Sequence, residues 1–571
     1  MAMYGPPLYG PHLYGTGGDV AYPPDFVYEM EKKRDTTPFV LVEHIDLSGT
    51  VTDISSYYLS DGNVSREKER APDEIQAGDF DIELLNHDNY FSEYIATSLF
   101  YGVQYHLSKI RISAGFILAN GATVTEKMCL GYIDEIEAQS DGSKVTLRCR
   151  DLIHRIIDEK LHLRPSEETP TAGGANVGDG TVSSLETKPF KVVNEDWTLT
   201  CTTPGADGVA VFSVVGSVSG DVGDATSGTE FSTGTGVGGI KFTINAGDTP
   251  WSLNDAFTFS TWQRPEWTQE NPVKIIWSIL TGYNYDTGAE EAWADSVFDL
   301  DSTQDDTNVD IDYASFVDAI DKITGTTLTG YVDYNESAQD FLESLLLLFL
   351  GSLISDADGK IMVKTWSPSI EGVVRVFADS LKVTELGYTR SINEVINYVR
   401  VAYKKTASWQ FSGEDIVYDG WYVAKDTGSI AKYGKLSEEY TTRWYMSGGT
   451  HAEDFAERIL DRYAEPPLVI SFATGSDGLL SEIGDKIYIT DEKYGFSLAG
   501  AEISKIAKNF DSSPLKVEIS ARRDTSMDTI YGYLGSRSDE GDGISPQADT
   551  YSGASASDKL FCYLGRGYKM Y

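Results

Sequence analysis

The chain has 571 residues, of which 41% are hydrophobic and 12% aromatic, so it can bury several cores and is expected to form roughly three to five domains. Its formal net charge of −42 excludes an extended surface that grips nucleic acid through phosphate contacts, and it disfavours adhesion to an anionic membrane. Four scattered cysteines without a CxxC pair favour neither a zinc site nor a disulfide scaffold, and fit folding in a reducing cytoplasm.

Low-complexity sequence stands at both ends of the chain. Residues 1–24 repeat Tyr-Gly with prolines between, and residues 526–571 are rich in Gly, Ser, Asp and Tyr. Neither segment can bury a core alone, so each is predicted to be an arm that orders against a neighbouring subunit or a disordered tail. The start shows no basic and apolar regions of a secretion signal. We expect no membrane anchor, because the most apolar stretch, 341–354, is too short to span a bilayer and is predicted to be one buried helix.

The first folded segment, 25–164, is predicted to be a β-barrel domain. Apolar and polar residues alternate along 39–54, 79–86 and 109–118, and residues 131–151 indicate two antiparallel strands around a Ser140-Asp141-Gly142 turn. The spacing of apolar residues in 152–161 predicts a closing helix.

Residues 165–262 change character and predict an inserted β-sandwich, because short strand patterns rich in Val and Thr alternate with Gly-rich turns. The insertion could bind host glycans or a neighbouring protein, or simply widen subunit contacts. Four tryptophans stand near its end and could seal a joint or stack on a sugar; we favour the joint. They are Trp251, Trp262, Trp267 and Trp277.

The segment 263–366 holds most of the helix signal and is predicted to be a helical, α+β connecting domain. Asn271 is a good N-cap and Pro272 a good first helical residue, and a second amphipathic helix is expected at 312–323. The acidic stretch 299–312 is interpreted as a solvated loop rather than a Ca²⁺ site because it lacks the turn glycine. Residues 356–360, DADGK, are interpreted as a plain turn before a strand.

Residues 367–525 predict a second β-barrel domain. Strand patterns at 468–475, 483–491, 496–510 and 515–524 suggest a small barrel, and an amphipathic helix is expected at 451–464. Together, the segments predict a mainly β protein with an α+β middle region: two tube-type β-barrel domains, a helical connecting region and an inserted β-sandwich.

Three local patterns in this order resemble the tail hub, or baseplate hub, proteins of tailed bacteriophages and related gene transfer agents. The first is an Asn-x-Asp-x-x-Phe-Ser turn, and the second is the start of the middle region. The third is a Gly-Asp turn that opens a strand of the second barrel. The matching residues are Asn86, Asp88, Phe91 and Ser92, then Asn271 and Pro272, then Gly484 and Asp485. The insertion and both arms fall outside the resemblance.

The resemblance implies a non-enzymatic structural protein with no catalytic residues, cofactor or metal. In that family the two barrels sit side by side, and three chains form a pseudo-sixfold ring at the distal end of the virion tail. Such a homotrimer would have the tail tube or distal tail protein above it and tip, fibre or spike proteins below. DNA would pass through its lumen without specific binding. The protein would be made in the host cytoplasm.

Three alternatives stay open from the sequence. A distal tail ring of sixfold symmetry would differ in copy number. An adsorption protein would recognise host carbohydrate through 165–262. A wall-degrading enzyme built on a hub would need a pair of carboxylates, and nothing in the sequence marks one pair among 88 acidic residues.

Overall fold

The computed structural model describes residues 37–523, apart from short internal segments, and both predicted arms lie outside the described residues. The internal segments that are not described are 62–63, 68–73, 76–77, 103–104, 107, 118–122, 158–160, 162–166, 189, 234–238, 292–297, 299, 324, 333–335, 367–372, 378–382, 405–417, 419, 447–449, 476–477, 492, 495 and 510–515.

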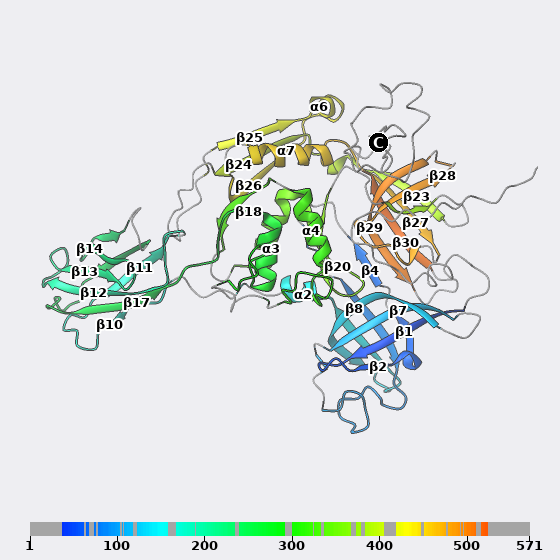
Figure 1. The fold of residues 1–571 in the computed structure, drawn as a ribbon, viewed down its shortest axis with the longest axis horizontal. Coiled ribbons are helices and arrows are strands. Elements are labelled where there is room, and N and C mark those ends of the chain that lie inside the picture. Colours follow the sequence, from blue (N-terminus) through cyan, green and yellow to red (C-terminus); the bar gives the residue numbers. More distant parts are fainter. Residues whose placement is uncertain are drawn as a thin grey trace, which may run out of the picture.

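The largest sheet has 14 strands and curves into two half-barrels, coloured blue and orange in Figure 1. The first half-barrel contains β1 (Thr37–Ile45), β2 (Val51–Asp53), β3 (Tyr58–Asp61), β4 (Val64–Glu67), β6 (Asp79–Leu85), β7 (Lys109–Ile117), β8 (Thr123–Ala138) and β9 (Lys144–Arg150). The second contains β22 (Val373–Phe377), β23 (Thr384–Arg390), β27 (Leu468–Thr474), β28 (Lys486–Asp491), β29 (Phe496–Asn509) and β30 (Lys516–Arg523).

The two half-barrels are joined edge to edge by backbone pairing. Strand β4 runs antiparallel to β29, with Val64 opposite Lys508 and Glu67 opposite Lys505. The main path of the sheet is β2-β1-β7-β8-β9-β6-β4-β29-β30-β27-β23. Inward side chains alternate along the strands, as in β6, and one hydrophobic core includes Ile82 of the first half-barrel and Ile519 of the second. The halves therefore form one packed unit.

A helical region packs beside the half-barrels. Its helices are α2 (Leu152–Ile157), α3 (Pro272–Thr281), α4 (Tyr313–Lys322), α5 (Ala338–Leu346), α6 (Thr427–Tyr433) and α7 (Thr450–Tyr463). One sheet contains β18 (Glu266–Glu270), β19 (Leu328–Tyr331), β26 (Ser437–Met446), β24 (Tyr398–Lys404) and β25 (Gly420–Lys425), and a smaller one contains β21 (Ile361–Thr365), β20 (Gly351–Ser355) and β5 (Glu74–Ile75). The described residues also include the 3-10 turns η3 (Leu347–Phe349) and η4 (Ile392–Glu394), and η1 (Ser55–Tyr57), which contacts β1 of the first half-barrel.

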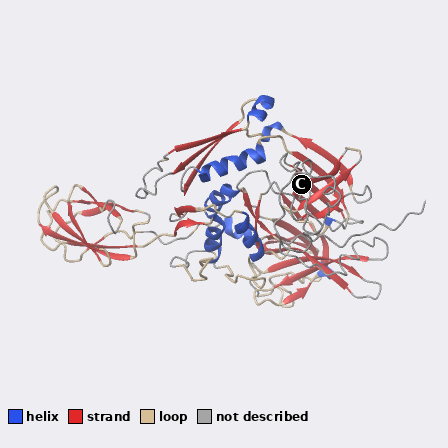
Figure 2. Ribbon diagram, turned by 45° about the horizontal axis from the view of Figure 1, so that its top comes forward, coloured by secondary structure: helices blue, strands red, loops and turns tan. Residues whose placement is uncertain are grey.

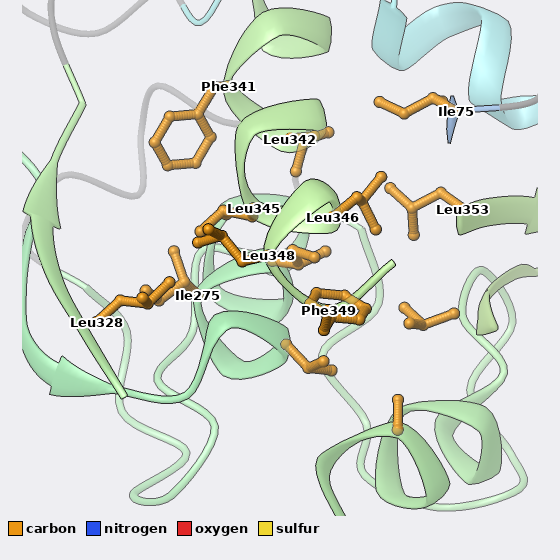
Figure 3. Close-up of a cluster of buried hydrophobic side chains, with 14 of the residues drawn as sticks. Ile75, Ile275, Leu328, Phe341, Leu342, Leu345, Leu346, Leu348, Phe349 and Leu353 are labelled. Atoms are coloured by element: carbon orange, nitrogen blue, oxygen red, sulfur yellow. The ribbon is translucent and has the colours of Figure 1, made fainter. Parts of the chain in front are cut away.

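Leucines of α5 and η3 fill the centre of this region. Figure 3 shows Leu345 of α5 on the side of Ile275 of α3 and Leu328 of β19, whereas Leu346 of α5 points toward Leu353 of β20. All five side chains are fully buried. Burial of an apolar face supplies most of the stability of a short helix.

Residues 167–262 form two facing sheets that stand apart from the rest of the molecule, at the left of Figures 1 and 2. One contains β10 (Thr171–Ala172), β17 (Ala256–Thr261), β12 (Glu195–Thr203), β13 (Val211–Gly216) and β14 (Gly220–Thr226), and the other contains β11 (Thr181–Thr187), β16 (Ile240–Asn245) and β15 (Glu230–Ser232). They enclose a separate core that includes Trp197, Phe212 and Phe242. The sandwich therefore has its own source of stability.

The mainly β fold is confirmed. The turn at Ser140-Asp141-Gly142 joins β8 to β9, with Gly142 at a φ of 69° that a glycine adopts without strain. Helix α4 is found in the predicted segment 312–323, and α7 in the predicted segment 451–464.

The prediction of one helix over 341–354 is wrong. Helix α5 ends at Leu346, η3 follows, and Leu350 adopts a left-handed φ of 53° before β20 begins at Gly351. The ring of Phe349 lies where a Cβ on Gly351 would be, so the chain turns tightly there. The apolar pattern did not predict the end of the helix, because a buried helix and a fully buried strand can lie within one continuous apolar run.

The segment 367–525, predicted as a single barrel, is divided between two sheets. Strands β24, β25 and β26 pair with β18 and β19, and α7 packs on β24 and β25. Likewise β5 and α2, from the segment predicted as the first barrel, join the core of the helical region. The predicted domain boundaries were wrong because they assumed a continuous segment, whereas the polypeptide leaves the second half-barrel after β23 and returns to it at β27.

Candidate functional site

The Asn86–Ser92 turn closes one end of the first half-barrel. Oδ1 of Asn86 accepts a hydrogen bond from the amide of Phe91 (3.0 Å), and Oδ1 of Asp88 accepts one from the amide of Tyr90 (3.2 Å). Ser92 accepts a hydrogen bond from the Ser98 hydroxyl through its carbonyl. The turn thus satisfies its own backbone groups, which is the usual task of Asn and Asp in turns.

Aromatic packing fixes this turn on the barrel. Phe91 is buried and lies edge-on to Tyr57 and Tyr90, whose rings stack with centroids 4.8 Å apart. The Tyr57 hydroxyl donates to Oδ2 of Asp88 (3.0 Å), and this hydrogen bond raises the pKa of Tyr57. Sequence reasoning placed an aromatic side chain here and did not foresee Tyr57, which comes from η1, 31 residues earlier than Asp88.

Asn271 and Pro272 begin helix α3. Oδ1 of Asn271 accepts a hydrogen bond from the amide of Val273 (2.9 Å), and Pro272 occupies the first helical turn. Gly282 ends the helix in the left-handed conformation with a φ of 77°. These residues position a helix in the core of the middle region and leave no side chain for chemistry.

Gly484 and Asp485 form the turn before β28. Gly484 has a φ of 81°, and its amide donates to the carbonyl of Ile503 (2.9 Å). Oδ2 of Asp485 accepts from the amide of Glu482 (2.8 Å). Burial raises the pKa of Asp485 to about 6, while Lys364, with its Nζ 4.0 Å from Oδ1, opposes the rise.

The three turns lie in different parts of the fold, and each stabilises its own element. A different set of charged residues meets where both half-barrels contact the hairpin formed by β20, β21 and the turn between them. Lys127 of β8 pairs with Asp358 of that turn. On the other side, Lys508 of β29 pairs with Glu482 at 2.7 Å, and the Lys508 side chain is only 4% exposed. We call these residues, with Asp356, Lys364 and Asp485, the junction.

The β20–β21 turn is shaped to fit against the first half-barrel. Asp356 accepts a hydrogen bond from the amide of Lys360 through Oδ1 (2.8 Å), and Gly359 has a φ of 78°. A Cβ on Gly359 would lie 2.7 Å from Cδ2 of Leu130, so only a glycine allows this approach to β8. The interpretation of 356–360 as a turn is confirmed; its contact with the first half-barrel was not predicted.

Asp356 is the most perturbed carboxyl group of the junction. Burial raises its pKa to about 7, and the carboxylates of Asp358, Asp312 and Glu482 add to the rise, whereas the Lys360 amide opposes it. Glu126 of β8, beside Lys127, has its pKa raised by burial and by Asp358. Titratable groups from three parts of the fold therefore meet here. Their ion pairs connect these parts to one another.

The tryptophans at the end of the insertion do not form one cluster. Trp251 is buried in the core of the sandwich, and Trp277 in that of the helical region. Trp267 lies against Phe341 and Trp444, with ring centroids 6.0 and 6.4 Å away. These three buried indoles cannot offer a face to a sugar. Trp267 packs near the point where the sandwich joins the helical region, and Trp262, which is half-buried, directly follows β17 at the same joint.

The acidic stretch expected to be a solvated loop satisfies its own amides. Oδ1 of Asp305 accepts from the hydroxyl (2.6 Å) and the amide (2.8 Å) of Thr307, and these bonds lower the pKa of Asp305. Among the described residues, no three His, Cys, Asp or Glu side chains are grouped so that they could hold a metal ion.

Two further properties concern membranes and thiols. None of the helices in the described part of the chain has the length and apolar character needed to cross a bilayer. Cys149 is fully buried, and burial raises the pKa of its thiol, which keeps it protonated and a poor nucleophile.

No protein-family model and no curated protein sequence matches this chain. Solved structures that resemble it include several that are described as phage or prophage tail proteins. The 43 kDa tail protein of prophage MuSo2 from Shewanella oneidensis is 11% identical, with 86% of this chain and 100% of that chain covered and a TM-score of 0.39. A tail protein from Neisseria meningitidis MC58 is 10% identical, with 86% and 99% covered and a TM-score of 0.40. The prophage tail protein gp18 from Listeria monocytogenes EGD-e is 8% identical, with 85% and 94% covered and a TM-score of 0.37.

Proposed function

We propose that this chain is a structural, non-enzymatic subunit of a phage-type tail, namely a hub of the baseplate or tail tip. One observation supports this most strongly. Two half-barrels of a single chain are hydrogen-bonded side by side through β4 and β29, and they share one core. Two barrel sectors in one chain are what a pseudo-sixfold ring of three subunits requires.

The strands at the two ends of the large sheet support the closure of a ring. The main path ends at β2 in the first half-barrel and at β23 in the second, on opposite ends of the sheet. Unpaired strand edges are favourable places for another chain to add, and a closed ring removes them. Three copies then place six half-barrels around a lumen, which continues a sixfold tail tube and tapers it to threefold symmetry.

The junction gives the ring its mechanical stiffness. The β20–β21 turn contacts the first half-barrel through Lys127 and Leu130. Lys364, at the end of β21, faces Asp485 of the second half-barrel at 4.0 Å. The angle between neighbouring sectors is thereby fixed by a third element. A tail tube or distal tail protein docks above such a ring, and tip, fibre or spike proteins dock below it.

The charge of the chain suits the passage of DNA. A net charge of −42 offers few cations to phosphates, so DNA moves through the lumen without specific binding. The chain then belongs to the virion, at the distal end of the tail.

A distal tail ring of sixfold symmetry is the alternative within the same class of proteins. It would use six copies of this chain, and the copy number per particle separates the two. A wall-degrading enzyme would release peptidoglycan fragments, and we expect the purified chain to release none.

Antibody labelling of purified particles tests the location. Gold-labelled antibody against this chain is applied to intact particles and viewed by electron microscopy, with pre-immune antibody as the control. We expect label only at the distal end of the tail. Label along the tube, on the head, or on no particle would exclude a hub.

A further inference from the structure

The end of the sandwich that lies farthest from its attachment exposes aliphatic side chains on three loops. The chain enters β12 at Glu195 and leaves β17 at Thr261 on the attached side, so the loops after β12 and before β17 lie at the free end. There Val177 is 62% exposed, Val209 58% and Leu253 59%. We call these three side chains and their loops the tip. The three loops adjoin one another, and exposed aliphatic side chains on adjoining loops can form the centre of a binding site.

The loops of the tip are held together in one shape. The buried carboxylate of Asp255 accepts hydrogen bonds from the amides of Val177 (2.8 Å), Gly178 (2.9 Å) and Ser252 (2.8 Å). Gly205 and Trp251 exchange two backbone hydrogen bonds, of 3.1 and 3.0 Å. The three loops therefore need little ordering when a partner binds, which removes an entropic cost of association.

The tip carries negative charge only. Asp179, Asp207 and Asp248 are exposed on the same loops, while segments 171–180, 203–210 and 245–256 contain no lysine or arginine. A second copy of the tip would bring carboxylates against carboxylates. The complementary surface has an apolar centre and a rim of Lys and Arg.

The tip offers no aromatic platform for a glycan. Sugars in protein sites stack on exposed aromatic faces, and the one aromatic residue of these three segments, Trp251, is only 2% exposed. Three aliphatic side chains also bury far less surface than the roughly 2,000 Å² or more of a permanent subunit interface. The tip therefore suits a reversible contact that is steered by charge.

We propose that the tip docks reversibly on a basic protein surface of the target cell, with Val209 and Leu253 at the apolar centre and Asp248 in the acidic rim. This inference rests on the proposed place of the chain at the end of a tail, because only there does the projecting sandwich meet a cell. Recognition of host carbohydrate by the insertion is a different hypothesis, and the periodate treatment below distinguishes the two.

Adsorption of particles that carry variants of the full chain tests the proposal. Val209→Asp and Leu253→Asp each place a charge at the apolar centre, and Asp248→Lys reverses a rim charge. All three residues are exposed, so folding is expected to be unaffected. The matched control is Val218→Asp, because Val218 is 69% exposed on the β13–β14 hairpin at the attached end of the same sandwich.

We expect Val209→Asp and Leu253→Asp to lower the adsorption rate at least about tenfold, the change that 1.4 kcal/mol of lost binding produces. Asp248→Lys should lower the rate and weaken its dependence on salt. Val218→Asp should adsorb like wild type. Protease treatment of the cells should reproduce the loss, and periodate oxidation of surface glycans should not.

Wild-type adsorption by the Val209 and Leu253 variants, equal losses in the Val218 control, or a loss caused by periodate alone would overturn the proposal. Immunoblots of the purified particles separate this failure from that of the proposed function. Absence of the chain from wild-type particles contradicts the hub, whereas its presence with unchanged adsorption contradicts only the role of the tip.

Discussion

Replacing Asp356 by asparagine should stabilise the junction in a pH-dependent way. The Asp356 carboxyl is half-buried among the carboxylates of Asp358, Asp312 and Glu482, and its pKa is raised from 3.8 to about 7. Asparagine keeps an oxygen that can accept the hydrogen bond from the Lys360 amide, which is 2.8 Å from Oδ1 in the native turn. The substitution therefore removes the charge and retains the turn.

The sign follows from proton binding. Because the folded state holds the Asp356 proton more tightly than the unfolded state does, stability falls as the pH rises from about 4 to about 7. The difference of about 3 pKa units corresponds to about 4 kcal/mol at most, and solvent screening of a half-buried group reduces it to about 2–4 kcal/mol. The asparagine variant gains this amount at pH 8 and less than about 1 kcal/mol at pH 4.5.

Hydrogen exchange measured by mass spectrometry gives the local free energy of opening of β20 and β21, after correction for intrinsic exchange rates. Wild-type protection of these strands should fall between pH 4.5 and pH 8, and the Asp356→Asn variant should stay nearly constant. Asp305→Asn is the control with the opposite sign, because hydrogen bonds from Thr307 lower the pKa of Asp305, and this variant should loosen its loop above pH 5. Equal effects of Asp356→Asn at both pH values would refute the reasoning.

Substitutions at three positions test the segments that matched the tail-protein resemblance. Phe91→Ala should cost about 3–5 kcal/mol because Phe91 is 2% exposed, and a chemical denaturation midpoint equal to wild type would contradict its place in the core. Asn271→Ala should lose about 1 kcal/mol through the helix cap while Asn271→Asp keeps it, as thermal unfolding can show; equal losses would exclude capping. Gly484→Ala should cost about 1–2 kcal/mol because its φ is 81°, and Gly484→Asn should cost less in the same unfolding assay; the reverse order would be contrary to this explanation.

Local features of this protein could be predicted from sequence because short-range chemistry determines them. Asn271 caps α3 within two residues of its own position, and the Ser140-Asp141-Gly142 turn requires only a glycine with positive φ. The strand alternation in β6 likewise shows in the order of its side chains.

The junction could not be predicted because its partners are far apart in the chain. Lys127 and Asp358 are 231 residues apart, and nothing near either residue indicates the other. There is little signal in the sequence even at Lys508 of β29, because that strand also carries Glu502 and Lys505, and only the fold shows that Lys508 is the buried cation that requires a carboxylate partner. The end of α5 was missed for a different reason, since the run of leucines continues unchanged from helix into strand.

Symmetry analysis of the tail tip by cryo-electron microscopy tests the central claim most directly. Reconstructions of the distal density are calculated without imposed symmetry, and the copy number of this chain is counted. We predict three copies, whose six half-barrels surround one lumen, with β4 paired to β29 inside each chain. Six copies around the lumen would indicate a distal tail ring, and half-barrels that line no lumen would contradict the hub.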